Sequence, residues 1–179
     1  VSRKAFKESF KASEEIAEEA WGLFKQEKWG ELEELFNQNN LNGGWPPNNG
    51  FIDIDLKPLK EGSFIDRYGG YIHDETGKFT DQGNFFAKDG EAFTNRALPE
   101  GAENKFYSRY EVIKDIPGTK EGKAIPWFGE KGEGIQYLFT ENTDDLVKAG
   151  YLRRISTTAP ASKTLYTTGI FNRGSRNFT

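Results

Sequence analysis

The stretch FIDIDLKPLKEGSFIDRYGG (residues 51–70) separates two kinds of sequence pattern in this chain. Before it, apolar residues recur at helical spacing. Within it and after it, short runs rich in Ile, Phe, Tyr and Val alternate with Gly, Pro and Asp, which is typical of strands and turns. We expect strands at 51–56, 63–68, 107–113, 136–139 and 151–156. The pattern predicts an α+β fold, with a helical N-terminal segment followed by a mostly antiparallel β-sheet core with long loops.

The N-terminal segment has the spacing and the start signal of amphipathic helices. Phe6 and Phe10 are four positions apart, so they share one helix face. Ser13, which two glutamates follow, suits a helix start. We expect Gly30 to separate this helix from a second one at 31–38. The aromatic side chains are expected to pack on a core, with a partner-binding helix as the alternative.

A turn-rich run, NQNNLNGGWPPNNG (residues 37–50), ends the helical segment. We therefore expect three parts: a helical lead or linker at 1–43, a main body at 44–156 and a last stretch at 157–179. The last stretch is either a loose tail or an edge strand. A short helix is expected in the main body after Thr143.

The composition excludes several classes of site. The length of 179 residues suits one domain. Because the chain has no Cys, it has no disulfide, no thiolate nucleophile and no zinc site of the Cys type. Its single His73 cannot make a His-rich metal site, and a Ser-His-Asp triad would have to use it. The net charge of −4 argues against nucleic-acid binding, and the apolar runs are too short for a membrane span.

The beginning of the chain indicates a longer protein. The chain starts at Val1 and contains no Met, so we expect a fragment or a processed form. It shows no signal-peptide pattern of basic start, apolar centre and cleavage site. Any export signal is expected to lie outside these residues.

Two motifs carry arginines next to turn residues. DRYGG (66–70) ends a predicted strand, where glycines let a backbone approach a ligand and Arg67 offers a planar fork for phosphate. NRALP (95–99) places Arg96 in a loop. Two arginines that converge from different loops would clamp a pyrophosphate. The alternatives are a surface Arg on a hairpin and a solvated or salt-bridged Arg.

Two further motifs carry rings and glycines. IPWFGEKGEGIQY (125–137) combines two rings with three glycines and places Gln136 at the start of a strand. Since no helix follows, it is a poor dinucleotide fingerprint and is better interpreted as the lip of a pocket. GKF (77–79) places Phe79 in a loop. The alternatives are an exposed strand position for the Gln and local hydrophobic packing for the Phe.

These motifs occur together in one known pattern. The sequence resembles the TNT domain, named after the tuberculosis necrotizing toxin, a family of NAD glycohydrolase toxin domains. The matching pieces lie in family order within residues 44–156: WPPNNGF (45–51), IDRYG (65–69), GKF (77–79), NRALP (95–99), YSRYEV (107–112), IPWFG (125–129), GIQY (134–137) and LVKAGYLR (146–153).

The resemblance implies hydrolysis of NAD or NADP at the nicotinamide–ribose bond, which gives nicotinamide and ADP-ribose. The family's key catalytic residue is a Gln, which Gln136 matches, and Arg67 and Arg96 would join it by neutralising the pyrophosphate. The leaving group is already cationic, so no general acid is required. The resemblance implies four substrate-binding residues: Tyr68, Phe79, Ser108 and Trp127.

The sequence departs from the family in two places. The founding toxin and many relatives have a His where Ser108 stands, so a His-dependent mechanism is not carried over. The turn between Gly69 and Gly77 is longer than in relatives and contains His73, which we interpret as an exposed loop residue with a role at the site left open. No dense Asp/Asn loop is present, so we expect no metal, and no cofactor besides NAD or NADP as substrate.

The resemblance also implies a biological setting. Such domains often form the C-terminal end of polymorphic bacterial toxins, so we expect a delivery module upstream, secretion into a target cell and a cognate immunity protein. Two alternatives stay open: a non-catalytic binding module, or an ADP-ribosyl cyclase or transferase, for which Glu133 is the only glutamate close to Gln136 in sequence. A nuclease is disfavoured by the charge and by the lack of a His pair.

Overall fold

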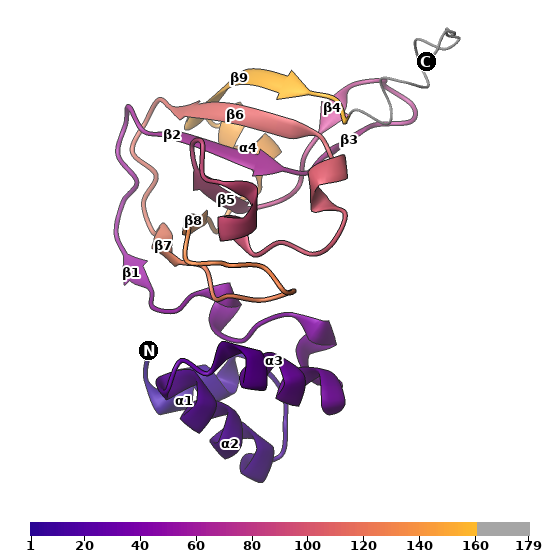
Figure 1. Cartoon of the computed structure of the whole chain (residues 1–179). Helices are drawn as coiled ribbons and strands as arrows, with labels where there is room; N and C mark the ends of the chain where they lie inside the picture. Colours follow the sequence, from indigo (N-terminus) through magenta and orange to yellow (C-terminus); the bar gives the residue numbers. More distant parts are fainter. Residues whose placement is uncertain (161–179) are drawn as a thin grey trace, which may run out of the picture. The chain divides into compact units, whose positions relative to one another are not determined.

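The elements of the protein occur in the predicted order, helices first and strands after (Figure 1), which confirms the α+β class. The computed structural model describes residues 1–160. The chain divides into two interleaved units. The first comprises Val1–Leu56, Glu91–Leu98 and Lys120–Tyr137, and the second comprises Lys57–Gly90, Pro99–Thr119 and, of the described residues, 138–160.

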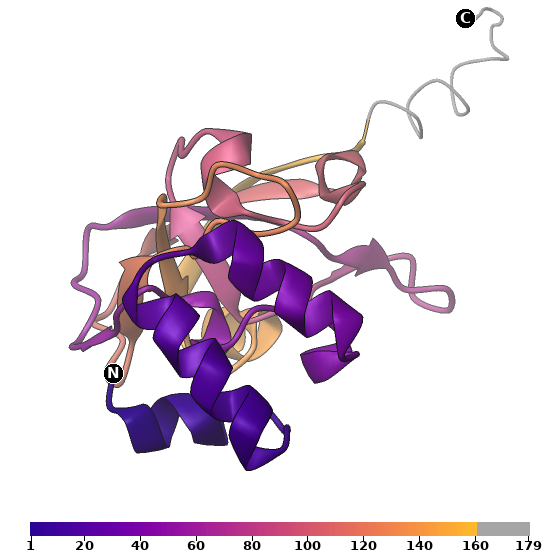
Figure 2. The ribbon, with the colours of Figure 1, turned by 60° about the horizontal axis from the view of Figure 1, so that its bottom comes forward.

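Three helices open the first unit: α1 (Arg3–Glu8), α2 (Glu14–Lys25) and α3 (Trp29–Gln38), with α2 and α3 side by side (Figure 2). Serine side chains cap the first two, since Ser2 Oγ accepts from Ala5 N at 3.0 Å and Ser13 Oγ accepts from Ile16 N at 3.3 Å. The predicted break at Gly30 is wrong. Gly30 lies in the first turn of α3, and the chain turns just before the helix, where Glu27 has a φ of 55°.

The apolar faces of these helices form the core of the first unit, as expected for their aromatic residues. Phe6 is fully buried, and its ring centroid lies 4.7 Å from that of Phe24 and 5.4 Å from that of Phe10. Trp127 is also fully buried in this core and meets Phe36 edge-on at 5.5 Å. The helical lead and the loop at 125–129 therefore share one core.

The strands of the first unit are short. They follow the order β1 (Asp55–Leu56), β7 (Lys120–Lys123) and β8 (Ile135–Leu138), with β1 antiparallel to β7. The strand predicted at 51–56 is mostly wrong, because Phe51 makes only an isolated bridge to Ala124. Asp53 Oδ1 accepts from Ile54 N at 3.0 Å, a local bond that competes with strand pairing. Three 3₁₀ turns complete this unit: η1 (Leu41–Gly44), η2 (Asn48–Gly50) and η3 (Phe93–Arg96).

The second unit is built on four antiparallel strands in the order β5 (Phe85–Lys88), β2 (Phe64–Tyr68), β6 (Tyr107–Val112) and β9 (Leu152–Thr158). Figure 1 shows β2, β6 and β9 running side by side. The helix α4 (Thr143–Lys148) contacts β9, and β3 (Tyr71–Ile72) pairs with β4 (Phe79–Thr80). The turn η4 (Ala102–Asn104) precedes β6.

Most of the predicted strands and the late helix are confirmed within two residues: β2, β6, β8, β9 and α4. The strands β3, β4, β5 and β7 were not predicted, because they are two to four residues long and lack clear alternation. Along β6, Ser108, Tyr110 and Val112 are buried and face the core of the second unit.

The last part of the sequence is described only in its beginning. β9 ends at Thr158, so the first residues of the stretch predicted as a tail or an edge strand belong to the last strand in the order of this sheet. Residues 161–179 lie outside the described part, and the boundaries at 43/44 and 156/157 stay predictions. Within residues 1–160, the helices are all too short or too polar to cross a membrane.

Candidate active site

Arg67, near the end of β2, is held from several sides. Its Nε lies 2.8 Å from Asp81 Oδ2, and its Nη1 donates to Phe85 O at 2.5 Å. Its guanidinium carbon lies 5.6 Å from the ring centroid of Phe86. The side chain of Arg67 is 13% exposed and that of Asp81 only 1%. The positive charge of Arg67 is therefore balanced inside the second unit by a buried carboxylate.

Two glycines make room for this guanidinium. A Cβ atom at Gly69 would lie 2.2 Å from Arg67 Nη2, and one at Gly83 would lie 2.1 Å from the same atom. Any larger residue at either position would push the guanidinium away from Asp81. Gly69 was expected to let a ligand approach the backbone, whereas the structure shows the side chain of Arg67 in that space.

Asp81 is a residue that the sequence did not single out. Its Oδ1 also accepts from Gly83 N at 3.0 Å, and its backbone N–H donates to Asp144 Oδ2 at 3.0 Å. Thr143 Oγ1 donates to Gly83 O at 2.7 Å, so the first residues of α4 brace this turn. Asp81 lies 14 positions from Arg67, in a segment (DQGN) that has the pattern of an ordinary turn. Nothing in its spacing indicated the pair.

Ser108 lies directly opposite Arg67 in the pairing of β2 with β6, but it is not accessible. Its side chain has no exposed surface, and its Oγ lies 2.8 Å from Thr157 Oγ1. Ser108 therefore offers no exposed surface in this structure, and its contact with a substrate stays a prediction. Tyr68 projects to the opposite face of β2 from Arg67, since side chains alternate along a strand. Its ring centroid lies 4.9 Å from that of Tyr107.

Phe79 in β4 is half-buried and packs locally. Its ring meets Phe106 edge-on at 5.4 Å, and it closes over Gly70, where a Cβ atom would lie 2.4 Å from Phe79 Cζ. The guanidinium carbon of Arg154 lies 4.8 Å from its centroid, a cation–π contact that the sequence did not predict. The local packing named as the alternative is therefore present, and part of the ring stays exposed.

Gln136 in β8 is half-buried and has a defined amide orientation. Its Nε2 donates to Gly50 O at 2.8 Å. A carbonyl oxygen can only accept, so the amide nitrogen must face Gly50. Within residues 1–160 the Oε1 atom accepts no hydrogen bond. The first unit thus presents a fixed neutral amide whose oxygen is available as an acceptor.

Arg96 closes the turn η3 and is 6% exposed. Its Nε and Nη2 donate to Glu91 O at 3.0 and 2.8 Å. The carboxylate of Glu91 accepts from Asn95 Nδ2 at 3.0 Å and from Ile135 N at 3.1 Å. Glu91, which the sequence did not single out, therefore links the turn of Arg96 to the residue before Gln136.

Trp127 belongs to the core of the first unit. It is fully buried, and its Nε1 donates to Gly44 O at 2.8 Å. No part of this ring is exposed, and its stacking on a substrate stays a prediction. The exposed ring of this region is Trp45, which is 54% exposed and meets Phe128 edge-on at 5.3 Å.

Two buried tyrosines have perturbed acidity. Burial raises the pKa of Tyr137 to about 12, and the carboxylates of Glu121 and Glu91 add to this shift. Burial also raises the pKa of Tyr110, with the charge of Asp81 as the next cause. Both hydroxyls therefore stay protonated at neutral pH. Within residues 1–160, no three His, Asp or Glu side chains gather in a way that could hold a metal ion.

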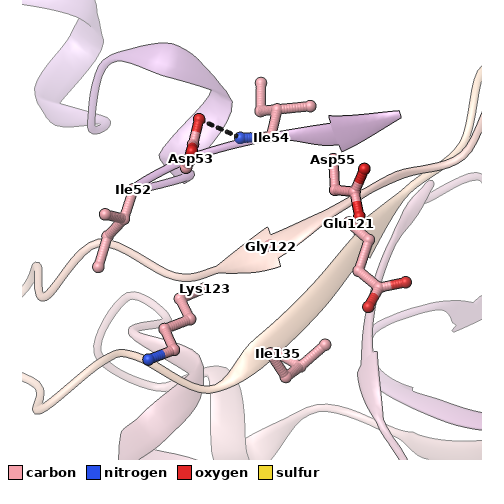
Figure 3. A pocket seen from close by; sticks show the side chains of 8 residues that line it. All are labelled: Ile52, Asp53, Ile54, Asp55, Glu121, Gly122, Lys123 and Ile135. Atoms are coloured by element: carbon pink, nitrogen blue, oxygen red, sulfur yellow. Dashed lines mark hydrogen bonds between the residues drawn. The ribbon is translucent and has the colours of Figure 1, made fainter. Parts of the chain in front are cut away.

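The first unit also has a pocket of about 480 Å³ beside β1 and β7 (Figure 3). It is lined by Ile52, Asp53, Ile54, Asp55, Glu121, Gly122, Lys123 and Ile135. None of the predicted site residues lines it. Those residues instead divide between the units: Arg96, Trp127 and Gln136 lie in the first, and Arg67, Tyr68, Phe79 and Ser108 lie in the second.

Fold and site define an α+β protein whose candidate chemistry rests on arginines, rings and a neutral amide. Comparison with known proteins gives the family. The family model of the tuberculosis necrotizing toxin (TNT) matches residues 58–155, and the chain belongs to this family.

Two individual proteins show the extent of the likeness. The conidial surface nicotinamide adenine dinucleotide glycohydrolase nadA of Aspergillus fumigatus is 32% identical over an alignment of 126 residues, which covers 62% of this chain and 49% of that protein. This chain therefore spans about half the length of that relative. Among solved structures, tuberculosis necrotizing toxin complexed with its immunity factor IFT is similar with a TM-score of 0.49 and 22% identity, over 62% of this chain and 60% of that one.

Proposed function

We propose that this protein hydrolyses NAD or NADP at the nicotinamide–ribose bond. Water adds to C1′ of the ribose, the C1′–N bond breaks, its electron pair returns to the pyridinium nitrogen, and one proton is released. The observation that supports this proposal most is the family match over residues 58–155, which contains Arg67, Phe79, Arg96 and Gln136. The identity with a protein named as an NAD glycohydrolase adds to it.

Gln136 is the catalytic residue in this proposal. Gly50 O holds its amide nitrogen, and its Oε1 can accept a hydrogen bond from the attacking water or from a ribose hydroxyl. A placed acceptor lowers the barrier by orienting the nucleophile before reaction. A neutral amide does not titrate and the leaving group is already cationic, so the rate should vary little with pH near neutrality. A steep acid limb near pH 6 would contradict this mechanism.

The arginines bind the pyrophosphate in this proposal, and Phe79 contributes a ring face. Arg96 is preorganised by two hydrogen bonds to one carbonyl oxygen. Because Asp81 already balances the charge of Arg67, Arg67 also holds the strand end and the turn at 81–85 in place. We expect changes at Arg96 to raise KM more than they lower kcat.

The decisive experiment is an NAD-consumption assay on the purified protein, with nicotinamide and ADP-ribose both quantified. We expect equal amounts of the two products, and a loss of about a hundredfold or more in kcat for Gln136→Ala with the fold retained. Gln38→Ala, at the exposed C-terminal end of α3, is the matched control and should keep full activity. A cyclic product or an ADP-ribosylated protein would contradict hydrolysis. No NAD loss at micromolar enzyme, with and without divalent metal, would contradict the function as a whole.

We also propose that the activity serves a toxin. In this proposal the domain acts inside a target cell, depletes its NAD, and is blocked in the producing cell by a cognate immunity protein. The description of the family as a necrotizing toxin supports this part. Expression in a bacterial cytoplasm should lower cellular NAD and stop growth, whereas Gln136→Ala should be tolerated. Equal growth arrest by both proteins would show that the toxicity has another cause.

A further inference from the structure

Three successive residues of the first unit have left-handed backbone conformations. Asn48, Asn49 and Gly50 have φ angles of 56°, 53° and 79°. The left-handed region costs free energy for any residue with a Cβ atom, and it is normally visited by single residues. Such strain persists only where the surroundings hold it, and it is concentrated at functional sites. The location of this turn, η2, therefore needs an explanation.

The turn directs one carbonyl group at two partners. Gly50 O accepts from Ile125 N at 2.9 Å and from Gln136 Nε2 at 2.8 Å. A right-handed conformation at Gly50 would rotate this oxygen away from both donors. The strained turn thus ties down the loop that begins at Ile125 and sets the orientation of the Gln136 amide.

One hydrogen bond to the C-terminal end of α1 and one bond to the residue after the turn hold the turn in place. Asn48 is 5% exposed; its Nδ2 donates to Phe51 O at 2.8 Å, and its backbone N–H donates to Ser9 Oγ at 2.9 Å. Ser9 is the C-cap residue of α1, and its hydroxyl donates to Phe6 O at 2.6 Å. Since Phe6 is fully buried in the core of the first unit, Ser9 is itself fixed in place.

We propose that Ser9 and the turn Asn48–Gly50 are positioning residues for Gln136. They act through the amide orientation of Gln136 and give Ser9, at the C-terminal end of α1, a positioning role, although it lies outside the family match at 58–155. The proposal rests on the proposed function, in which Gln136 is the catalytic residue. Perturbing the turn should therefore lower kcat and leave KM nearly unchanged.

Gly50→Ala with Gly150→Ala as control tests the turn. Gly150, which follows α4, has a φ of 85° and no atom within 4 Å of an added Cβ, so both variants meet the same backbone strain. At Gly50 the added Cβ also lies 3.6 Å from Gln136 Nε2. We expect similar losses of Tm in both variants, and a tenfold loss of kcat with KM within twofold only in Gly50→Ala. An equal loss of kcat in both, or a loss confined to KM, would overturn the proposal.

Ser9→Ala with Ser2→Ala as control tests the link to α1. Ser2 caps the start of the same helix through Ala5 N, and none of its hydrogen bonds involves the turn. Ser9→Ala should lower kcat about threefold to tenfold, Ser9→Thr should restore it because its hydroxyl can still accept, and Ser2→Ala should leave kcat unchanged. Equal kcat values for Ser9→Ala and the wild type would show that Ser9 does not position Gln136.

A third measurement does not depend on activity. The side-chain amide signals of Gln136 can be assigned by NMR from their loss in Gln136→Ala, and their hydrogen exchange reports the bond to Gly50. Exchange should accelerate in Gly50→Ala and Ser9→Ala, and stay as in the wild type in Ser2→Ala. If the protein consumes no NAD or NADP, the proposed function fails, but the exchange rates still test whether Ser9 and the turn at 48–50 fix the Gln136 amide. Unchanged exchange in Gly50→Ala and Ser9→Ala would overturn the inference even in an active enzyme.

Discussion

Replacing Arg67 with Ala is expected to destabilise the protein. The change removes the partner of Asp81, whose side chain is only 1% exposed. Removing one member of a buried ion pair costs about 3–5 kcal/mol, since the remaining charge has lost its compensation. Asp81 still accepts from Gly83 N at 3.0 Å, and Arg67 keeps 13% exposure, so we expect the lower end, about 3 kcal/mol.

Urea unfolding of Arg67→Ala, Asp81→Asn and the double variant measures this contribution. Because the two residues contact each other, the double variant should lose less than the sum, with a coupling of about 2 kcal/mol. Gly83→Ala should disrupt the same ion pair sterically, since its Cβ would lie 2.1 Å from Arg67 Nη2. The control is Arg153→Ala, which breaks an exposed pair with Glu111 and should cost less than about 1 kcal/mol.

The opposite result would refute this reasoning. The free energy of unfolding of Arg67→Ala could lie within about 0.5 kcal/mol of the wild-type value, as it does for ordinary surface changes. In that case the pair with Asp81 contributes nothing to stability. A raised KM with unchanged kcat and stability would then show that Arg67 acts mainly through substrate binding, which is the role that the sequence alone suggests.

Two further predictions concern buried rings of the first unit. The pKa of Tyr137 is raised from 10 to about 12, so the unfolded chain loses this proton first; stability that is present below pH 10 is lost as the pH rises to about 12. Tyr137→Phe should lessen that loss in urea unfolding followed across this range, and identical alkaline losses would contradict the assignment. Trp127→Ala should cost about 3–5 kcal/mol through the cavity and the lost bond to Gly44. A raised KM without loss of stability would instead show that Trp127 acts in substrate binding rather than in core packing.

Much of the fold could be predicted because its signals are local. The Ser13 cap and the apolar spacing of α2 depend on residues within a few positions of one another. The same holds for the strands β2, β6 and β9 and for α4. The break expected at Gly30 was wrong, because one glycine in the first turn of a helix costs only about 1 kcal/mol and packing of the apolar face outweighs it.

The sequence by itself determined the α+β class and the family. The class follows from local patterns and the family from eight short motifs in order, and neither requires knowledge of which residues are in contact. Only the tertiary structure decided what the site residues touch. Gln136 bonds a carbonyl 86 positions away, and Arg67 pairs with a carboxylate 14 positions away. Trp127 and Ser108 matched family motifs, yet both proved fully buried. A motif shows which chemical groups are present, whereas their partners and their exposure depend on how distant segments pack together.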